Sequence, residues 1–309
     1  MDQQEYARTS AAFLRFADEE ARDRSALYDE LARGAASDPL VIAFLLTLRK
    51  EKRQPNLLFA ATRLLFGTPS GWCQFRHVLR ENEDAIRAIM LKRSTQTNEP
   101  ARCATLLPVL ARLPQPLALI EVGASAGLCL MADRYGYDYR RGLVRPSVDQ
   151  LDPPVFSCVV NATTPVPTAP PRVTWRAGLD LDPVDISDPN QAAWLEALVW
   201  PEQSDRLAKL RIAMRIAAEN KPRIVEGDLR TDLARLDSGL AGLTSNKVPA
   251  ALKGRPSPSR SHRHAFDAAE PGADRKECKQ GAGDLADIAS HARASGRYRE
   301  REHRRKHVE

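Results

Sequence analysis

The sequence of 309 residues lacks long hydrophobic runs, is poor in aromatic residues and has no paired cysteine spacing. No apolar stretch approaches the roughly 20 residues that a bilayer-spanning helix needs, and the acidic N-terminus lacks the apolar core of a secretory signal. These absences predict a cytoplasmic protein without a membrane partner. Five cysteines in no C-x-x-C arrangement favour buried thiols over a disulfide framework, and they predict no metal site.

An excess of positive charge is also missing from most of the chain. The net charge is +6, and segment 245–309 alone carries 15 Lys and Arg against 9 Asp and Glu, so the first 244 residues are neutral overall. The same segment has too few apolar residues to offset the entropy of ordering it, which predicts a disordered, basic tail. Nucleic acid is a less favoured partner that only this tail could bind. Its Arg, Ala, Gly, Pro, Ser and His bias also fits translation in a shifted reading frame.

Helical periodicity covers residues 1–113 and predicts a helical N-terminal region. One apolar helix begins at Pro55, and the polar patch 93–102 precedes another helix at 101–113. Two interpretations of the patch stay open. In the first, Thr97 or Asn98 caps the helix. In the second, the polar side chains face a substrate, and the candidates are Asn56, Gln96, Asn98, Glu99 and Arg102.

The stretch 117–130 joins an apolar strand, a turn of small residues and the start of a helix. The run 117–122 is typical of a parallel strand that is buried on both faces. The turn Gly123-Ala-Ser-Ala-Gly127 has so little side-chain bulk that a ligand could approach the backbone where free N–H groups point outward. This turn is the best candidate for a site in the sequence.

Two further strands, 173–180 and 223–228, follow in order, with helices at 189–199 and 203–219 between them. This alternation, with carboxylates at the strand ends, predicts a doubly wound α/β domain at 114–240. Seven prolines between residues 145 and 172 predict a surface insertion at about 135–171, with an extra hairpin around 155–160.

The turn formally matches the G-x-S-x-G nucleophile elbow, in which Ser125 would be the nucleophile. Such a serine needs a histidine base. The chain has no histidine between Gly127 and Ser245, and His77 lies upstream in the helical region. A serine hydrolase is therefore the least favoured function.

The turn resembles the glycine-rich first turn of class I S-adenosylmethionine-dependent methyltransferases, as Glu121-x-Gly123-x-Ser125-x-Gly127. Asp180 and Asp228 stand where that family has the acids after its second and third strands. The resemblance implies a site for S-adenosylmethionine. The implied cofactor-binding residues are Glu121, Gly123, Ser125, Gly127, Asp180 and Asp228.

The chain also resembles a bacterial family known as domain of unknown function 2332. The residues that carry the resemblance are Gln54–Leu58, Gln96–Glu99 with Arg102, Leu119–Leu128, Asp133–Tyr137, Arg176–Asp180, Trp200–Gln203 and Glu226–Asp228. It covers about residues 5–236 and implies helices packed on a methyltransferase-like sheet, but no established activity. After Leu236 the tail replaces further strands, which predicts an incomplete sheet in which strand one has an open edge.

The sequence thus predicts an α/β protein with a helical N-terminal region, an incomplete methyltransferase-like parallel sheet and a disordered tail. The favoured function is that of an enzyme-like protein which binds S-adenosylmethionine. A non-catalytic binding or scaffold protein that keeps the fold is the alternative. The sequence does not indicate an acceptor substrate or an oligomeric state.

Overall fold

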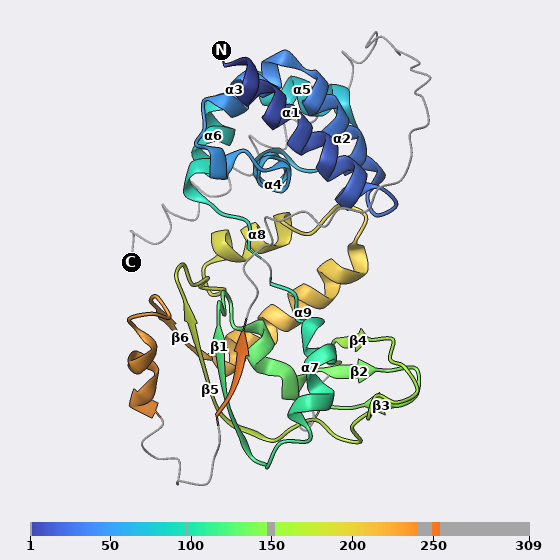
Figure 1. The fold of residues 1–309 in the computed structure, drawn as a ribbon, viewed down its shortest axis with the longest axis vertical. Coiled ribbons are helices and arrows are strands. Elements are labelled where there is room, and N and C mark those ends of the chain that lie inside the picture. Colours follow the sequence, from blue (N-terminus) through green and yellow to red (C-terminus); the bar gives the residue numbers. More distant parts are fainter. Residues whose placement is uncertain (1, 97, 147–151, 240–248, 254–309) are drawn as a thin grey trace, which may run out of the picture.

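The N-terminal part of the molecule is helical, as predicted. The computed structural model describes residues 2–96, 98–146, 152–239 and 249–253 (Figure 1). The helices are α1 (Gln3–Phe16), a π-helical turn η1 (Ala17–Ala21), α2 (Ala26–Ser37), α3 (Pro39–Leu46), the 3₁₀ turn η2 (Lys50–Lys52), α4 (Pro55–Phe66), α5 (Trp72–Glu81), α6 (Glu83–Lys92) and α7 (Arg102–Leu110). Pro39 and Pro55 occupy first-turn positions of their helices, where a missing N–H costs nothing.

The core of this part includes one element from much later in the chain. Phe59 makes ring contacts with Phe13 and Phe75, at centroid distances of 6.2 and 5.5 Å. Helix α8 (Pro189–Ala197) buries Trp194 and Ala197 in the same cluster. Figure 1 shows α8 between the N-terminal helices and the sheet below them. The helical half therefore includes a helix that follows β1 and β5 in the chain.

Within the described residues, the main sheet has four strands, all of them parallel. Its strands are β1 (Leu117–Val122), β5 (Val173–Asp180), β6 (Arg223–Glu226) and β7 (Pro249–Lys253), in the order β6-β5-β1-β7. Numbered along the chain, this order is 3-2-1-4, and the direction of strand addition therefore reverses beside β1. In doubly wound sheets, ligands bind outside the carboxyl ends of the strands at such a reversal.

The prediction that strand one has an open edge is wrong. Strand β7 pairs with β1 in parallel from Ala118 opposite Pro249 to Val122 opposite Lys253. The composition of the tail gave no sign of this five-residue strand, because a short strand at the edge of a sheet can be held by the backbone hydrogen bonds to its one neighbour, β1. The rest of the predicted disordered tail, residues 245–248 and 254–309, and its shifted-frame interpretation lie outside the described residues.

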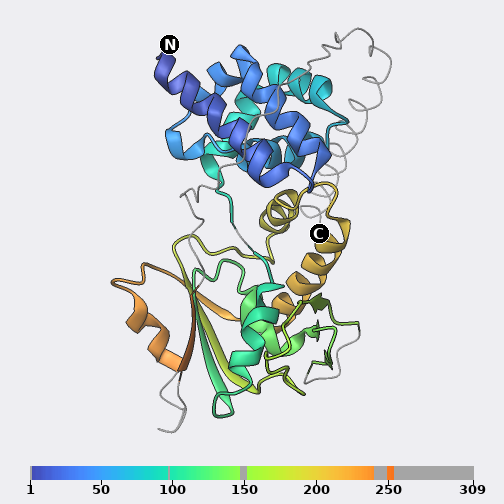
Figure 2. The ribbon, with the colours of Figure 1, turned by 45° about the vertical axis from the view of Figure 1, so that its right-hand side comes forward.

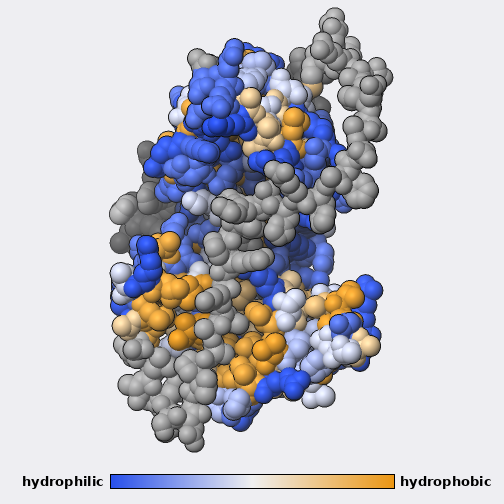
Figure 3. Space-filling view, in the orientation of Figure 1, coloured by the Kyte–Doolittle hydropathy of each residue, from blue (hydrophilic) through white to orange (hydrophobic). Residues whose placement is uncertain are grey.

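The two faces of the main sheet are covered unequally by the described elements (Figure 2). Helices α7 and α9 (Ser204–Asn220) and the 3₁₀ segment η3 (Leu128–Arg134) cover one face and form the larger core with it. On the other face, Leu236 of η4 (Leu233–Gly239) packs on Ala177 and Leu179. Figure 3 shows hydrophobic surface gathered over this sheet-containing half, whereas the helical half is mostly hydrophilic.

The insertion after η3 forms a second, small sheet. Strands β2 (Gly136–Asp138), β3 (Leu143–Val144) and β4 (Val155–Ser157) lie in the order β3-β2-β4. The predicted hairpin around 155–160 is wrong, because β4 pairs in parallel with β2 instead. Tyr135, Tyr137 and Tyr139 are buried here, and each hydroxyl donates to a backbone carbonyl. In the described ranges, no helix has the length and apolar character needed to cross a bilayer.

Candidate functional site

The turn after β1 has a left-handed backbone at three of its five positions. The φ angles are 74° at Gly123, 48° at Ser125 and 70° at Gly127. Glycine adopts this region without a steric penalty, whereas Ser125 is held there at a cost. The turn therefore bends sharply enough to leave the sheet and enter η3 within five residues.

Every N–H group of this turn has a protein partner. The N–H groups of residues 123 and 124 donate to the carbonyl of Leu179, at 2.8 and 3.3 Å, and that of Gly127 donates to the carbonyl of Ala124 at 2.7 Å. Ser125 N donates to Asp180 Oδ2 at 2.7 Å, and Ala126 N donates to Asn98 Oδ1 at 3.2 Å. A carboxylate and an amide oxygen thus occupy the positions that an anionic ligand would take in an open turn.

The hydroxyl of Ser125 lies between two amide side chains. It donates to Gln96 Oε1 and accepts from Asn98 Nδ2 at 2.8 Å. Gln96 Nε2 also donates to the carbonyl of Asp182 at 3.0 Å. Neither amide is a base, and His77 lies on α5 among the N-terminal helices. These contacts do not resemble an activated serine.

The interpretation of the polar patch as a helix cap is wrong for Asn98. Helix α7 begins at Arg102, and its N-cap residue Ala101 makes no side-chain cap hydrogen bond. Asn98 instead bonds Ser125 and Ala126 of the turn after β1. Thr97 lies outside the described residues. Glu99 does support the helix start, since Glu99 Oε1 accepts from Ala101 N at 3.1 Å.

Glu121 lies beneath the turn in the interior of the protein. Its side chain is 5% exposed, and Glu121 Oε2 has no hydrogen-bond partner among the described residues. Burial, reinforced by Cys129, raises the pKa of Glu121 to about 10, although Arg102 opposes the shift. The free thiols Cys103 and Cys129 are buried beside it, and their contact with each other together with burial raises the pKa of Cys129. Glu121 is therefore a neutral acid at physiological pH.

The two aspartates predicted with the turn have different environments. Asp180 ends β5 and accepts from Ser125 N and, through Oδ1, from Asp182 N at 2.8 Å. Asp228 follows β6, and its carboxylate binds Arg230, which lowers its pKa to about 2. The structure thus brings Asp180 to the turn, whereas the carboxylate of Asp228 is engaged with its own neighbour.

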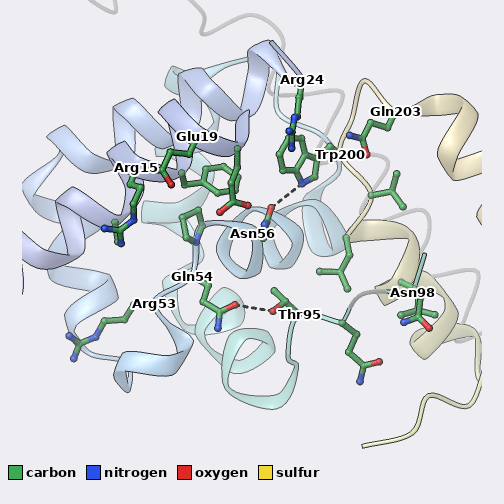
Figure 4. Close-up of a pocket in the computed structure, with 18 of the residues that line it drawn as sticks. Arg15, Glu19, Arg24, Arg53, Gln54, Asn56, Thr95, Asn98, Trp200 and Gln203 are labelled. Atoms are coloured by element: carbon green, nitrogen blue, oxygen red, sulfur yellow. Dashed lines mark hydrogen bonds between the residues drawn. The ribbon is translucent and has the colours of Figure 1, made fainter. Parts of the chain in front are cut away.

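A cleft of ≈ 1220 Å³ opens between the N-terminal helices and the chain that leads to the turn (Figure 4). Gln96 and Asn98 line it and also hold Ser125, so the cleft adjoins the carboxyl end of β1. Trp200 lines the opposite side and donates from its indole nitrogen to Asn56 Oδ1 at 2.9 Å. Side chains from α1, η1, α4 and the loop before α9 therefore surround one space.

Three of the predicted substrate-facing residues line this cleft, and two do not. Asn56, Gln96 and Asn98 belong to the lining, whereas Glu99 and Arg102 are outside it. Glu99 forms an ion pair with Arg206 of α9 at 2.6 Å. Arg102, at the start of α7, lies near Glu121, and its positive charge lowers the pKa of that carboxyl group. None of the six predicted cofactor-binding residues is part of this lining.

Sequence reasoning missed most of the charged and aromatic side chains of the cleft. They include Arg15, Glu19, Glu20, Arg24 and Trp200, and the polar side chain of Gln203 was missed as well. Trp200 and Gln203 are the first and last residues of Trp200–Gln203, one of the segments that carry the family resemblance. That resemblance was the sequence signal that could have identified these two residues. No sequence signal marks η1, because a π-helical turn differs from an α-helix by one residue per turn only.

Close packing between β5 and the turn makes a steric prediction. A Cβ atom on Gly178 would lie 2.4 Å from the Cβ of Ala124, an atom that only backbone movement can displace. We expect Gly178→Ala to lower the free energy of unfolding by about 2–3 kcal/mol in chemical denaturation. Gly142→Ala is the matched control, since its nearest neighbour would be Val166 Cγ1 at 3.5 Å. Equal midpoints for both variants would contradict the packing.

Comparison with known proteins gives one match. A family model described as "Uncharacterized protein conserved in bacteria (DUF2332)" matches residues 10–242. This range spans the N-terminal helices and strands β1, β5 and β6, and it ends before β7. No curated protein and no solved structure matches the chain. Within the described residues there is also no cluster of His, Cys, Asp and Glu that could hold a metal ion.

Proposed function

Since the chain belongs to the uncharacterised bacterial family DUF2332, whose description gives no activity, we propose from geometry that it binds a polar small molecule in the cleft. The observation that carries this proposal is the position of Gln96 and Asn98. They line a cleft of ligand size and at the same time hold the turn at the carboxyl end of β1. Ligand sites in parallel α/β sheets occur at this kind of position.

The test is a titration that follows the heat of binding and the thermal unfolding midpoint. Nucleosides, monosaccharides, amino acids and short peptides are added separately at millimolar concentration. Gln203→Trp should fill the cleft and weaken any hit at least about tenfold, because it removes space and a polar contact. Ala208→Trp adds the same bulk on the exposed side of α9 and should leave affinity unchanged. The proposal is contradicted if Gln203→Trp leaves the affinity for every hit unchanged, or if none of the compounds binds.

A second candidate is binding of S-adenosylmethionine at the turn, followed by methyl transfer. The strand order 3-2-1-4 and the position of Asp180 at the end of the second parallel strand support it. In this proposal Gly123, Ser125 and Gly127 provide backbone contacts and Asp180 binds the ribose. Because Asn98 Oδ1 already accepts from Ala126 N, and Asn98 and Gln96 both bond the Ser125 hydroxyl, the cofactor has to displace these two amides first.

Calorimetry with S-adenosylmethionine tests this candidate. If Asn98 competes with the cofactor, Asn98→Ala should bind it several-fold more tightly than the wild type, and Asp180→Ala should abolish the heat. Asn161→Ala, in the surface insertion, is the control. No heat with wild type or Asn98→Ala at millimolar cofactor contradicts cofactor binding. Binding without methyl transfer to any acceptor supports the alternative, a non-catalytic binding protein.

A further inference from the structure

The cleft presents charged groups of both signs that have no hydrogen bond or ion pair in the described part of the chain. Glu19 and Glu20 are the carboxylates, and Arg15, Arg24 and Lys50 are the cations. Other cations of the lining are committed, as shown by Arg53, which pairs with Glu5 at 3.0 Å. Figure 4 shows Arg15 and Glu19 on one side of the opening and Arg24 above it. The unpaired charges remain available to a ligand.

The carboxylates favour a cationic group. Glu20 is exposed to solvent along one side, but partial desolvation by its neighbours and the charge of Glu19 raise its pKa, and the positive charges of Arg24 and Arg15 do not reverse the shift. The positive charges of the protein therefore do not fully stabilise the ionised carboxylate of Glu20. An ammonium group bound between Glu19 and Glu20 would supply the missing positive charge.

Neutral polar groups line the space between these charges. Asn56 uses its carbonyl oxygen for Trp200, and Gln203 uses its carbonyl oxygen for Arg206 at 2.8 Å. Their amide N–H groups have no partner among the residues that the structure describes. They can donate to carbonyl oxygens of a ligand. One side of Trp200 packs on Phe16 and Tyr28, and the half-buried indole borders the cleft.

We propose that the ligand of this cleft is a short zwitterionic peptide. Its free ammonium group binds Glu19 and Glu20, its carboxylate binds Arg15 or Arg24, and its amide carbonyls accept from Asn56 and Gln203. Trp200 contacts an apolar side chain of the peptide. This inference rests on the proposed function, because it names the ligand class of the same cleft. A monosaccharide or a nucleoside would leave the charges of both signs without partners.

Three forms of one peptide test the proposal by calorimetry on the full chain. Trialanine carries both terminal charges, N-acetyl-trialanine lacks the ammonium group, and trialanine amide lacks the carboxylate. Trialanine should bind, and removal of either charge should weaken binding by at least about tenfold, the loss expected for a hydrogen bond between charged groups. Equal affinity of the three forms overturns the proposal.

Charge-neutral variants then assign each end of the peptide. In Glu19→Gln/Glu20→Gln, trialanine should bind no better than its N-acetyl form. In Arg15→Gln/Arg24→Gln, it should bind no better than its amide. These four side chains are exposed, so folding should be retained. Arg22→Gln is the matched control, because Arg22 pairs with Asp18 and does not line the cleft. Loss of the charge preference in the control would overturn the assignment.

The outcomes separate this inference from the proposed function. If a sugar or nucleoside binds and Gln203→Trp blocks it while trialanine does not bind, the cleft is a ligand site and the peptide class is wrong. If trialanine binds but Gln203→Trp leaves its affinity unchanged, the peptide site lies elsewhere and the assignment to this cleft is wrong. If no probe of any class binds, both the proposed function and this inference fail.

Discussion

Replacing Glu121 with glutamine is expected to flatten the pH dependence of stability between about pH 5 and pH 9. In the folded protein, burial followed by Cys129 raises the pKa of Glu121 from 4.5 to about 10. The unfolded chain loses this proton above its ordinary pKa, so unfolding releases a proton throughout the window. A carboxyl whose folded pKa is raised therefore contributes stability that is present at low pH and falls as pH rises.

The expected size of the effect follows from proton linkage. Within the window, wild-type stability should fall by about 1.4 kcal/mol per pH unit relative to Glu121→Gln. Over three units the difference reaches about 4 kcal/mol, a large part of the stability of an ordinary domain. The loss should stop above about pH 10, where Glu121 ionises in the folded state as well.

Urea denaturation at a series of pH values measures this difference. Glu226→Gln is the control, since Glu226 ends β6 with an exposed side chain, and its curve should run parallel to that of the wild type. A Glu121→Gln curve that is also parallel to the wild type would show that Glu121 is ionised when folded. Glutamine keeps the shape of the side chain, so the slope is informative even if absolute stability changes.

The fold was predictable where local pattern and packing agree. Helices in the first 113 residues and parallel strands at 117–122 and 173–180 follow from apolar periodicity and from turn residues at their ends. The third strand is shorter than predicted and ends at Glu226. Each of these elements has a buried apolar face, so its secondary structure can be recognised from the spacing of its own apolar residues.

The errors came from features that depend on distant partners. Strand β7 is rich in residues that are uncommon in strands (Pro, Ala and Lys), so its sequence gives no strand signal, and its pairing with β1 is what identifies it. One of the two interpretations left open made Asn98 a helix cap, because Asn is a good capping residue, but in the fold its side chain bonds Ser125 and Ala126. Short polar side chains bond whichever backbone group is nearest. Sequence spacing does not reveal that choice.

The sequence predicted the turn of the candidate site and some residues of the cleft, but not how they come together. The turn itself follows from its small residues, and the structure places Asn56, Gln96 and Asn98 along the cleft beside it. These residues belong to Gln54–Leu58 and Gln96–Glu99, and a third segment of the resemblance, Trp200–Gln203, reaches the same cleft. Their convergence needed coordinates, because about 100 residues separate the second segment from the third.

Two other segments of the resemblance meet in a buried ion pair. Arg176 of β5 donates to both oxygens of Asp133, at 2.8 and 3.0 Å, and its guanidinium also donates to the carbonyl of Leu130. The side chains are only 13% and 5% exposed. The pair fixes the end of η3 against the strand whose last residue, Asp180, holds the turn. The ion pair therefore helps to position the turn, although neither of its residues lines the cleft.

Removing one partner of this pair should be strongly destabilising. We expect Asp133→Ala to lower the free energy of unfolding by about 3–5 kcal/mol, because Arg176 then keeps a buried charge without its carboxylate. The double variant Asp133→Leu/Arg176→Met removes both charges and should recover most of the loss. Asp205→Ala is the control, since it breaks the exposed pair with Lys209 and should cost no more than about 0.5 kcal/mol.

Guanidinium denaturation of the three variants decides between a charge effect and a packing effect. If the double variant is as unstable as Asp133→Ala, the lost volume and hydrogen bonds dominate and the pair is needed for its shape. If it recovers, the penalty lies in the uncompensated charge. Because η3 and β5 meet at the turn, recovery of folding in the double variant should also restore any ligand binding in the cleft.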